Sequence, residues 1–86
     1  MEPYKTLSYP LMGEKATMLR EKRNVLTFIV DKSATKKDIK AAVEQLFNVK
    51  VIGVTIMHTP YGNKKAHITL DKKHHADEIA SHMGVL

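Results

Sequence analysis

Three consecutive segments decide the fold of this chain: LTFIV (residues 26–30), TKKDIKAAVEQLF (residues 35–47) and VKVIGVTIM (residues 49–57). The middle segment begins with Thr35 and Asp38, a pattern typical of a capping box at a helix start. Its apolar residues then recur at helical spacing and form one stripe: Ile39, Ala42, Val43, Leu46 and Phe47. The three segments therefore predict a strand, an amphipathic helix and a second strand.

The residues that follow predict a hairpin. In residues 49–57 the apolar alternation changes parity at Gly53, which is typical of a β-bulge. Residues 59–64, TPYGNK, have the composition of a turn, and the alternation across residues 66–70 predicts a return strand. We expect a right-handed crossover between the two strands that the helix connects, and we expect the return strand to pair between them, as a split β-α-β unit.

The two ends of the chain complete the predicted architecture. Residues 3–8, bracketed by prolines, predict a short edge strand, and Glu14 to about Lys22 predict a helix with Gly13 as its N-cap. A last helix runs from about His75, with Met83 in its apolar stripe and Gly84 as its stop. We therefore expect one α+β domain over residues 1–86, with helices packed on a four-stranded antiparallel sheet of ferredoxin-like character.

Composition narrows the class of function. The 86 residues suffice for one modest core, and basic residues exceed acidic ones by five, which favours an anionic partner such as nucleic acid. There is no cysteine, which excludes disulfides, thiolate metal sites and a thiol nucleophile. No apolar run reaches the length of a signal peptide or a membrane span, so we expect a cytoplasmic protein without membrane insertion.

Lysines at the start of the predicted central helix indicate where such a partner binds. Lys36, Lys37 and Lys40 lie in the first turn of this helix or just beyond it. The helix dipole favours acidic residues at this N-terminal end, so helix stability does not explain the lysines, whereas an external polyanion does. Four more lysines and one turn tyrosine are candidates for contacts with RNA phosphates and bases: Lys15, Lys50, Lys64, Lys65 and Tyr61. The alternative is a solvated lysine face and a tyrosine that merely covers the hairpin.

Several motifs resemble one protein family. These are Glu14-Lys15-Ala16, the run from Ala34 to Val51, and Thr59-Pro60 followed by Gly62 and Lys64-Lys65-Ala66. Together they resemble universal large-subunit ribosomal protein twenty-three over about residues 4–86. Bacterial members carry a long basic extension between the last two strands, whereas this chain has a short turn and is similar to the archaeal type.

The resemblance implies a function and partners. Members of that family bind large-subunit ribosomal RNA beside neighbouring ribosomal proteins at the rim of the polypeptide exit tunnel. They offer a docking surface to the signal recognition particle or other nascent-chain factors, and the resemblance assigns factor docking to Glu14. This chain departs from the family pattern at three positions that bear on RNA contacts: Tyr9, Gly13 and Thr55.

Other kinds of site have weaker support. His74, Glu78 and His82 recur every four residues, but the helix is short and no further ligand completes a metal site. His58 and His67 lie on the two hairpin strands and could face each other across the pair as metal ligands, and the alternative is that they are only surface neighbours. No nucleophile elbow or phosphate loop predicts an enzyme, and no cofactor is expected. The alternative to a ribosomal protein is a free ferredoxin-like module that responds to a small molecule or metal.

Overall fold

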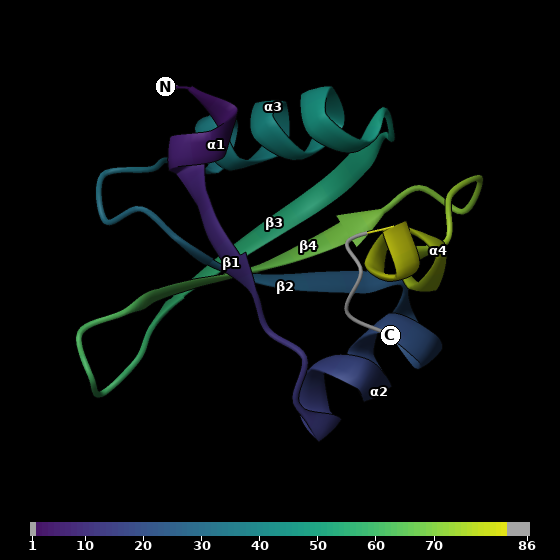
Figure 1. The fold of residues 1–86 in the computed structure, drawn as a ribbon, viewed down its shortest axis with the longest axis horizontal. Coiled ribbons are helices and arrows are strands. Elements are labelled where there is room, and N and C mark those ends of the chain that lie inside the picture. The colour runs from purple at the N-terminus through teal and green to yellow at the C-terminus, as the bar shows by residue number, and fades with distance from the viewer. Residues whose placement is uncertain (1, 83–86) are drawn as a thin grey trace.

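A computed structural model describes residues 2–82 of the chain. Its elements, in chain order, are α1 (Pro3–Thr6), β1 (Leu7–Pro10), α2 (Glu14–Arg23), β2 (Val25–Val30), α3 (Lys36–Phe47), β3 (Val51–His58), β4 (Lys64–Leu70) and α4 (Ala76–His82). The strands form one antiparallel sheet in the order β1-β2-β4-β3 (Figure 1). Because β4 pairs between β2 and β3, the predicted split β-α-β unit and the α+β fold class are confirmed.

Helices cover the sheet unequally on its two faces. Helices α1 and α3 lie on one side of the sheet and α2 lies on the other, with α4 beside one end of the strands (Figure 1). Every residue of β2 is buried, because the strand has apolar neighbours on both faces. Phe28 and its alternate neighbours face α3, whereas Thr27 and Ile29 face the side of α2, as the alternation predicts.

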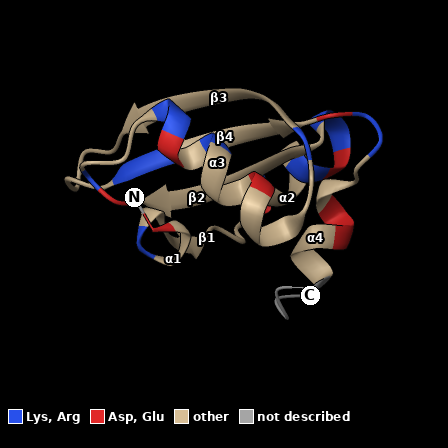
Figure 2. Cartoon of the chain, turned by 90° about the horizontal axis from the view of Figure 1, so that it is seen from above, with Lys and Arg blue, Asp and Glu red and all other residues tan. Residues whose placement is uncertain are grey.

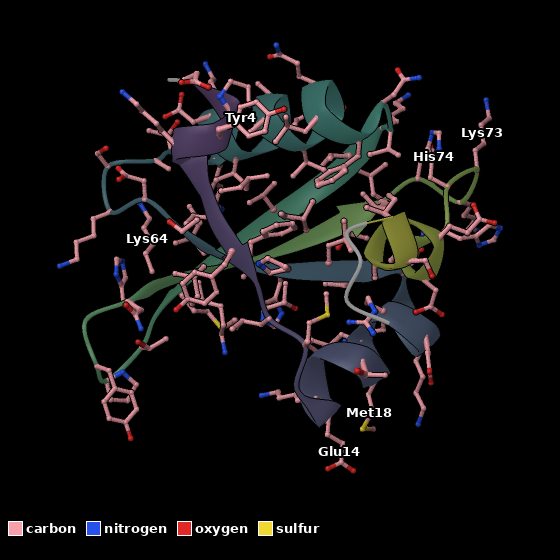
Figure 3. All side chains as sticks on the ribbon, in the orientation of Figure 1. Tyr4, Glu14, Met18, Lys64, Lys73 and His74 are labelled. Atoms are coloured by element: carbon pink, nitrogen blue, oxygen red, sulfur yellow. The ribbon has the colours of Figure 1, made fainter. Side chains whose placement is uncertain are left out.

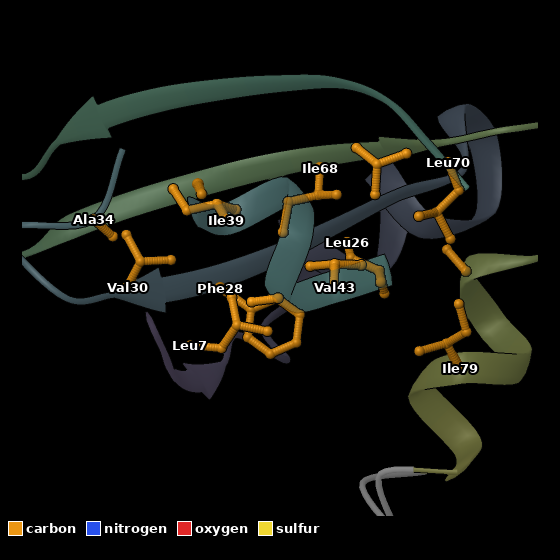
Figure 4. Packing of buried hydrophobic residues seen from close by; sticks show 14 residues of the cluster. Leu7, Leu26, Phe28, Val30, Ala34, Ile39, Val43, Ile68, Leu70 and Ile79 are labelled. Atoms are coloured by element: carbon orange, nitrogen blue, oxygen red, sulfur yellow. The ribbon is translucent and has the colours of Figure 1, made fainter. Parts of the chain in front are cut away.

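The main core lies between α3 and the sheet (Figure 4). Ile39 and Val43 are fully buried and pack against the strand residues Leu26 and Ile68. The rings of Phe28 and Phe47 lie 6.2 Å apart between centroids, in the range of a favourable aromatic pair. Leu46 and Phe47 are only partly buried, so the predicted apolar stripe is confirmed with its last turn at the margin of the core.

The ends of α3 are fixed by side chains. The Thr35 hydroxyl accepts from the Asp38 N–H at 3.2 Å, and the Asp38 carboxylate accepts from the Thr35 N–H at 3.0 Å, which confirms the predicted capping box. Farther along, the Glu44 carboxylate accepts from the Val51 N–H at 3.0 Å and joins the helix to the start of β3. The helix therefore determines where the strand after it begins.

The predicted bulge in β3 is also confirmed. The register with β4 shifts between Val51 and Gly53, so Ile52 is the extra residue, and its side chain is 60% exposed. After the shift, Val54 and Ile56 face the core. The bulge thus returns the apolar residues of β3 to the α3 face of the sheet.

The prediction of a strand over residues 3–8 is wrong for its first four residues. Residues 3–6 form the helical turn α1, and the strand itself is β1, which begins at Leu7. Pro3 fits the first turn of a helix because its missing N–H has no helical partner there. The turn packs against α3, a contact that local sequence does not encode. Met83 and Gly84, predicted to end the last helix, lie outside the described residues.

Candidate nucleic-acid interface

The three lysines at the start of α3 are exposed and lie together. Lys36, Lys37 and Lys40 border a hollow of about 160 Å³ whose other side is formed by residues 52–54 of β3. Strand β3 is at the edge of the sheet, so this hollow runs between a lysine-rich helix end and an open strand edge. The structure therefore brings these three predicted residues into one basic surface, which we call the α3 lysine surface (Figure 2).

One acid lies among these lysines. Hydrogen bonds from the backbone and side chain of Thr35 lower the pKa of Asp38 below its usual range. The Asp38 carboxylate is therefore ionised at neutral pH and oriented towards the helix start, where it offsets part of the dipole's repulsion of the lysines. The α3 lysine surface keeps a net positive charge because it holds three ammonium groups and one carboxylate.

The predicted hairpin residues have separate roles. The Lys64 ammonium donates to the Lys32 carbonyl at 3.3 Å and to the Ala34 carbonyl, so it holds the loop that precedes α3 (Figure 3). Tyr61 is 90% exposed at the hairpin tip, beside Gly62 with its positive φ of 84°. The structure therefore uses the Lys64 ammonium to hold this loop through two carbonyls, with a third donor remaining, and leaves the Tyr61 ring accessible for stacking.

Lys15 and Lys65 lie on the other side of the sheet. They border a cavity of about 190 Å³ between α2 and the face of β2 and β4 that lies opposite α3, which we call the open-face cavity. His67 also lines it, and partial burial, together with the nearby Lys65 and Lys15 ammonium groups, lowers the pKa of this histidine. His67 does not face His58, because the register places His67 opposite Thr55 and His58 opposite Lys64.

Lys50 belongs to a third region that the sequence reasoning missed in part. The Asp71 N–H donates to the Lys50 carbonyl at 2.9 Å, which brings the loop after β4 beside the loop before β3. Lys72 and Lys73 of that loop are exposed, and Lys73 projects into solvent (Figure 3). The adjacent pair was visible in the sequence as a charge cluster, but its proximity to Lys50 depends on the fold.

Glu14 is the first residue of α2 and is exposed. Met18, one turn later on the same helix, is 48% exposed, and both side chains point away from the sheet (Figure 3). An acid beside an exposed methionine gives this end of α2 a mixed polar and apolar surface.

Metal and membrane sites can be assessed for residues 2–82. Among the described side chains, those of residues 2–81, no group of three His, Asp or Glu converges on a point where a metal ion would bind, and the side chain of His82 lies outside that set. His74 precedes α4 and so does not share a helical face with Glu78. No helix in the described part is long and apolar enough to cross a bilayer.

Comparison with known proteins identifies the family. The family described as ribosomal protein L23 matches residues 5–77. Large ribosomal subunit protein uL23 from Pyrobaculum aerophilum is 52% identical over 76 residues, which cover 88% of this chain and 94% of the relative. The uL23 protein from Methanococcus aeolicus is 40% identical over 85 residues, covering 99% of each chain. On the strength of these matches, the chain belongs to the ribosomal protein L23 family.

Proposed function

We propose that the protein binds large-subunit ribosomal RNA near the polypeptide exit tunnel and forms part of the docking surface for nascent-chain factors. Its family places it in the large subunit of the cytoplasmic ribosome, where it contributes to translation. The role proposed there is structural and not enzymatic. This membership favours the ribosomal function over the alternative of a free regulatory module.

The α3 lysine surface is the observation that carries the RNA-binding proposal. Its three exposed ammonium groups oppose the helix dipole, so they weaken the isolated protein and are explained by an external polyanion. Within residues 2–82 no strand pairs with the outer edge of β3, so the backbone N–H groups of that edge are further donors for phosphate oxygens. Recognition there is of backbone and shape, since lysines contact phosphates without reading sequence.

Factor docking is proposed for the outer surface of α2. Glu14 and Met18 are exposed on the same side of that helix and project from the body of the protein. The family's members dock the signal recognition particle or other nascent-chain factors, and the resemblance assigns that role to Glu14. Neighbouring large-subunit proteins are the remaining partners expected.

The RNA-binding proposal is tested by the salt dependence of affinity for a large-subunit ribosomal RNA transcript. Replacing Lys36, Lys37 and Lys40 by glutamine should reduce the slope of log K against log salt by about 0.7 to 0.9 for each phosphate that is no longer neutralised. The control variant replaces Lys22 and Arg23 by glutamine; these residues belong to α2, on the opposite side of the sheet. For each variant the change in slope is divided by the number of charges removed. An equal slope change per charge in the two variants would contradict a specific role for the α3 lysine surface.

A further inference from the structure

A buried hydroxyl without a partner lies at the open-face cavity. Thr27 is 5% exposed, and its Oγ1 has no hydrogen-bond partner within the described part of the chain. An unpaired buried hydroxyl destabilises a folded protein, because it has given up its hydrogen bonds to water without replacing them. Thr27 also lines the open-face cavity, so a molecule bound there is the available source of a partner.

The residues around Thr27 give the cavity a definite chemistry. His67 pairs with Thr27 in the register of β2 and β4, so both side chains stand on the same face of the sheet. Leu11 and Leu19 supply apolar walls, and Lys15 and Lys65 border the cavity with two positive charges. None of the described residues that line it is acidic. The cavity therefore combines apolar walls, a polar floor and a cationic rim.

The volume of the open-face cavity limits the size of the ligand that it can hold. A volume of about 190 Å³ is well above that of one water molecule. It is below the roughly 300 to 1,000 Å³ of sites that enclose a drug-sized molecule. A single heteroaromatic ring system is of intermediate size and matches this volume.

We propose that the open-face cavity receives one unpaired nucleobase of ribosomal RNA, held by Thr27 and His67 while Lys15 and Lys65 contact the flanking phosphates. This inference rests on the proposed RNA-binding function. A rotation of Thr27 about χ1 turns its hydroxyl towards the cavity, where it pairs with the edge of the base. The base is read in an unstacked state, as is usual for sequence-dependent contacts to RNA.

The features of the cavity favour a base over its rivals. The lowered pKa keeps His67 neutral at physiological pH, so its ring is a stacking surface and not a third cation. A bare phosphate would leave the apolar walls without a contact, and an apolar side chain from a neighbouring protein would leave the Thr27 hydroxyl unpaired. A base has both an apolar face and polar edges, and it is attached to phosphates that the two lysines attract.

The test uses the full chain, an in vitro transcript of large-subunit ribosomal RNA, and the isosteric variant Thr27→Val. Removing the unpaired hydroxyl should raise the Tm of the free protein, yet weaken RNA affinity about 3- to 10-fold at every salt concentration. Thr27→Ser retains the hydroxyl and should bind RNA as the wild type does. Thr69→Val is the matched control, because Thr69 lies on the same sheet face without lining the cavity.

Variants of the two lysines at the rim of the cavity distinguish contacts to phosphates from contacts to the base. Lys15→Gln and Lys65→Gln should each reduce the salt slope by about 0.7 to 0.9, whereas Thr27→Val should leave the slope unchanged. Ultraviolet crosslinking should attach a nucleotide to the peptide that contains Lys65 and His67.

Each remaining outcome overturns one or both proposals. No binding by the wild-type protein would overturn RNA binding and the base site together. Equal RNA affinity of the wild type and Thr27→Val would overturn the base site alone. A crosslink from this cavity to a neighbouring protein in assembled subunits, in place of RNA, would identify a protein side chain as the occupant and also overturn the base site.

Discussion

Asn24 shows how a single residue joins distant elements. It ends α2 in the left-handed conformation, with φ of 58°, and its Nδ2 donates to three carbonyls, among them that of His74 at 2.7 Å. Its Oδ1 accepts from the Ala76 N–H at 2.7 Å, at the start of α4. Asparagine suits this position because it tolerates positive φ and carries both a donor and an acceptor.

We expect Asn24→Ala to reduce the free energy of unfolding by about 2 to 4 kcal/mol, through backbone strain and the removal of these hydrogen bonds. Asn24→Gly removes the strain and isolates the effect of the side-chain bonds. Asn48 is the matched control, since it ends α3 with φ of 54° and its side chain bonds to no other described residue. Asn48→Ala should cost only about 1 to 2 kcal/mol. Urea denaturation measures all three, and equal destabilisation by the two alanine variants would contradict the joining role of Asn24.

His67 makes stability depend on pH. Because burial lowers its pKa from 6.5 in the folded state, the unfolded chain takes up a proton at a higher pH than the folded protein does. Its contribution to stability is therefore complete above the unfolded pKa and is lost as pH falls through the interval below 6.5. His67→Gln should reduce the drop in Tm between about pH 7.5 and pH 5.5, measured by thermal melting. An unchanged drop would show that other groups cause it.

At the scale of elements, α3 depends on its last turn as well as its buried middle. Phe47 is partly buried, pairs with Phe28 and packs against the core. We expect Phe47→Ala to cost about 2 to 4 kcal/mol, slightly less than a fully buried phenylalanine would. Chemical denaturation of the isolated protein measures the change. Gln45→Ala, at an exposed position of the same helix, is the control and should change stability by less than about 0.5 kcal/mol.

Elements with strong periodicity could be predicted from the sequence. The stripe of α3, the alternation of β2 and β4 and the parity change at Gly53 each reflect which face of an element is buried. The turn α1 could not be predicted, because four residues are too few for a helical period and its packing on α3 is a long-range contact. Likewise, the buried Arg20 is paired with Asp77 at 3.3 Å, and no local pattern links residues so far apart.

The sequence could predict which residues belong to the candidate site, but it could not predict how they are arranged in space. Lysines at a helix start are visible in the sequence, and so is their conflict with the dipole. Whether an ammonium is free is not visible, since Lys64 bonds to carbonyls that precede it by about thirty positions. The unpaired state of the Thr27 hydroxyl depends on every atom around it, so the open-face cavity was also beyond sequence reasoning.

For the whole molecule, different residues are proposed to contact RNA and to dock nascent-chain factors. We expect Glu14→Lys to weaken the binding of signal recognition particle to intact large subunits at low salt, where electrostatic contacts are strongest. The variant should remain on the RNA, because Glu14 projects away from the sheet. Glu21→Lys, exposed on the same helix, is the control for a general charge effect. Equal factor affinity for Glu14→Lys and wild-type subunits would leave Glu14 only its role at the helix start.

The open sheet has two edges, and the bulge described above in β3, together with an irregularity in β1, bears on how the protein behaves before it joins a ribosome. A regular, flat edge strand is a template on which a second chain adds a strand and begins an aggregate. Strand β1 is short, shifts register between Leu7 and Tyr9 and ends at Pro10, which has no N–H to donate. Strand β3 is interrupted at Ile52. Both features therefore disfavour edge-to-edge pairing between newly made copies of the chain.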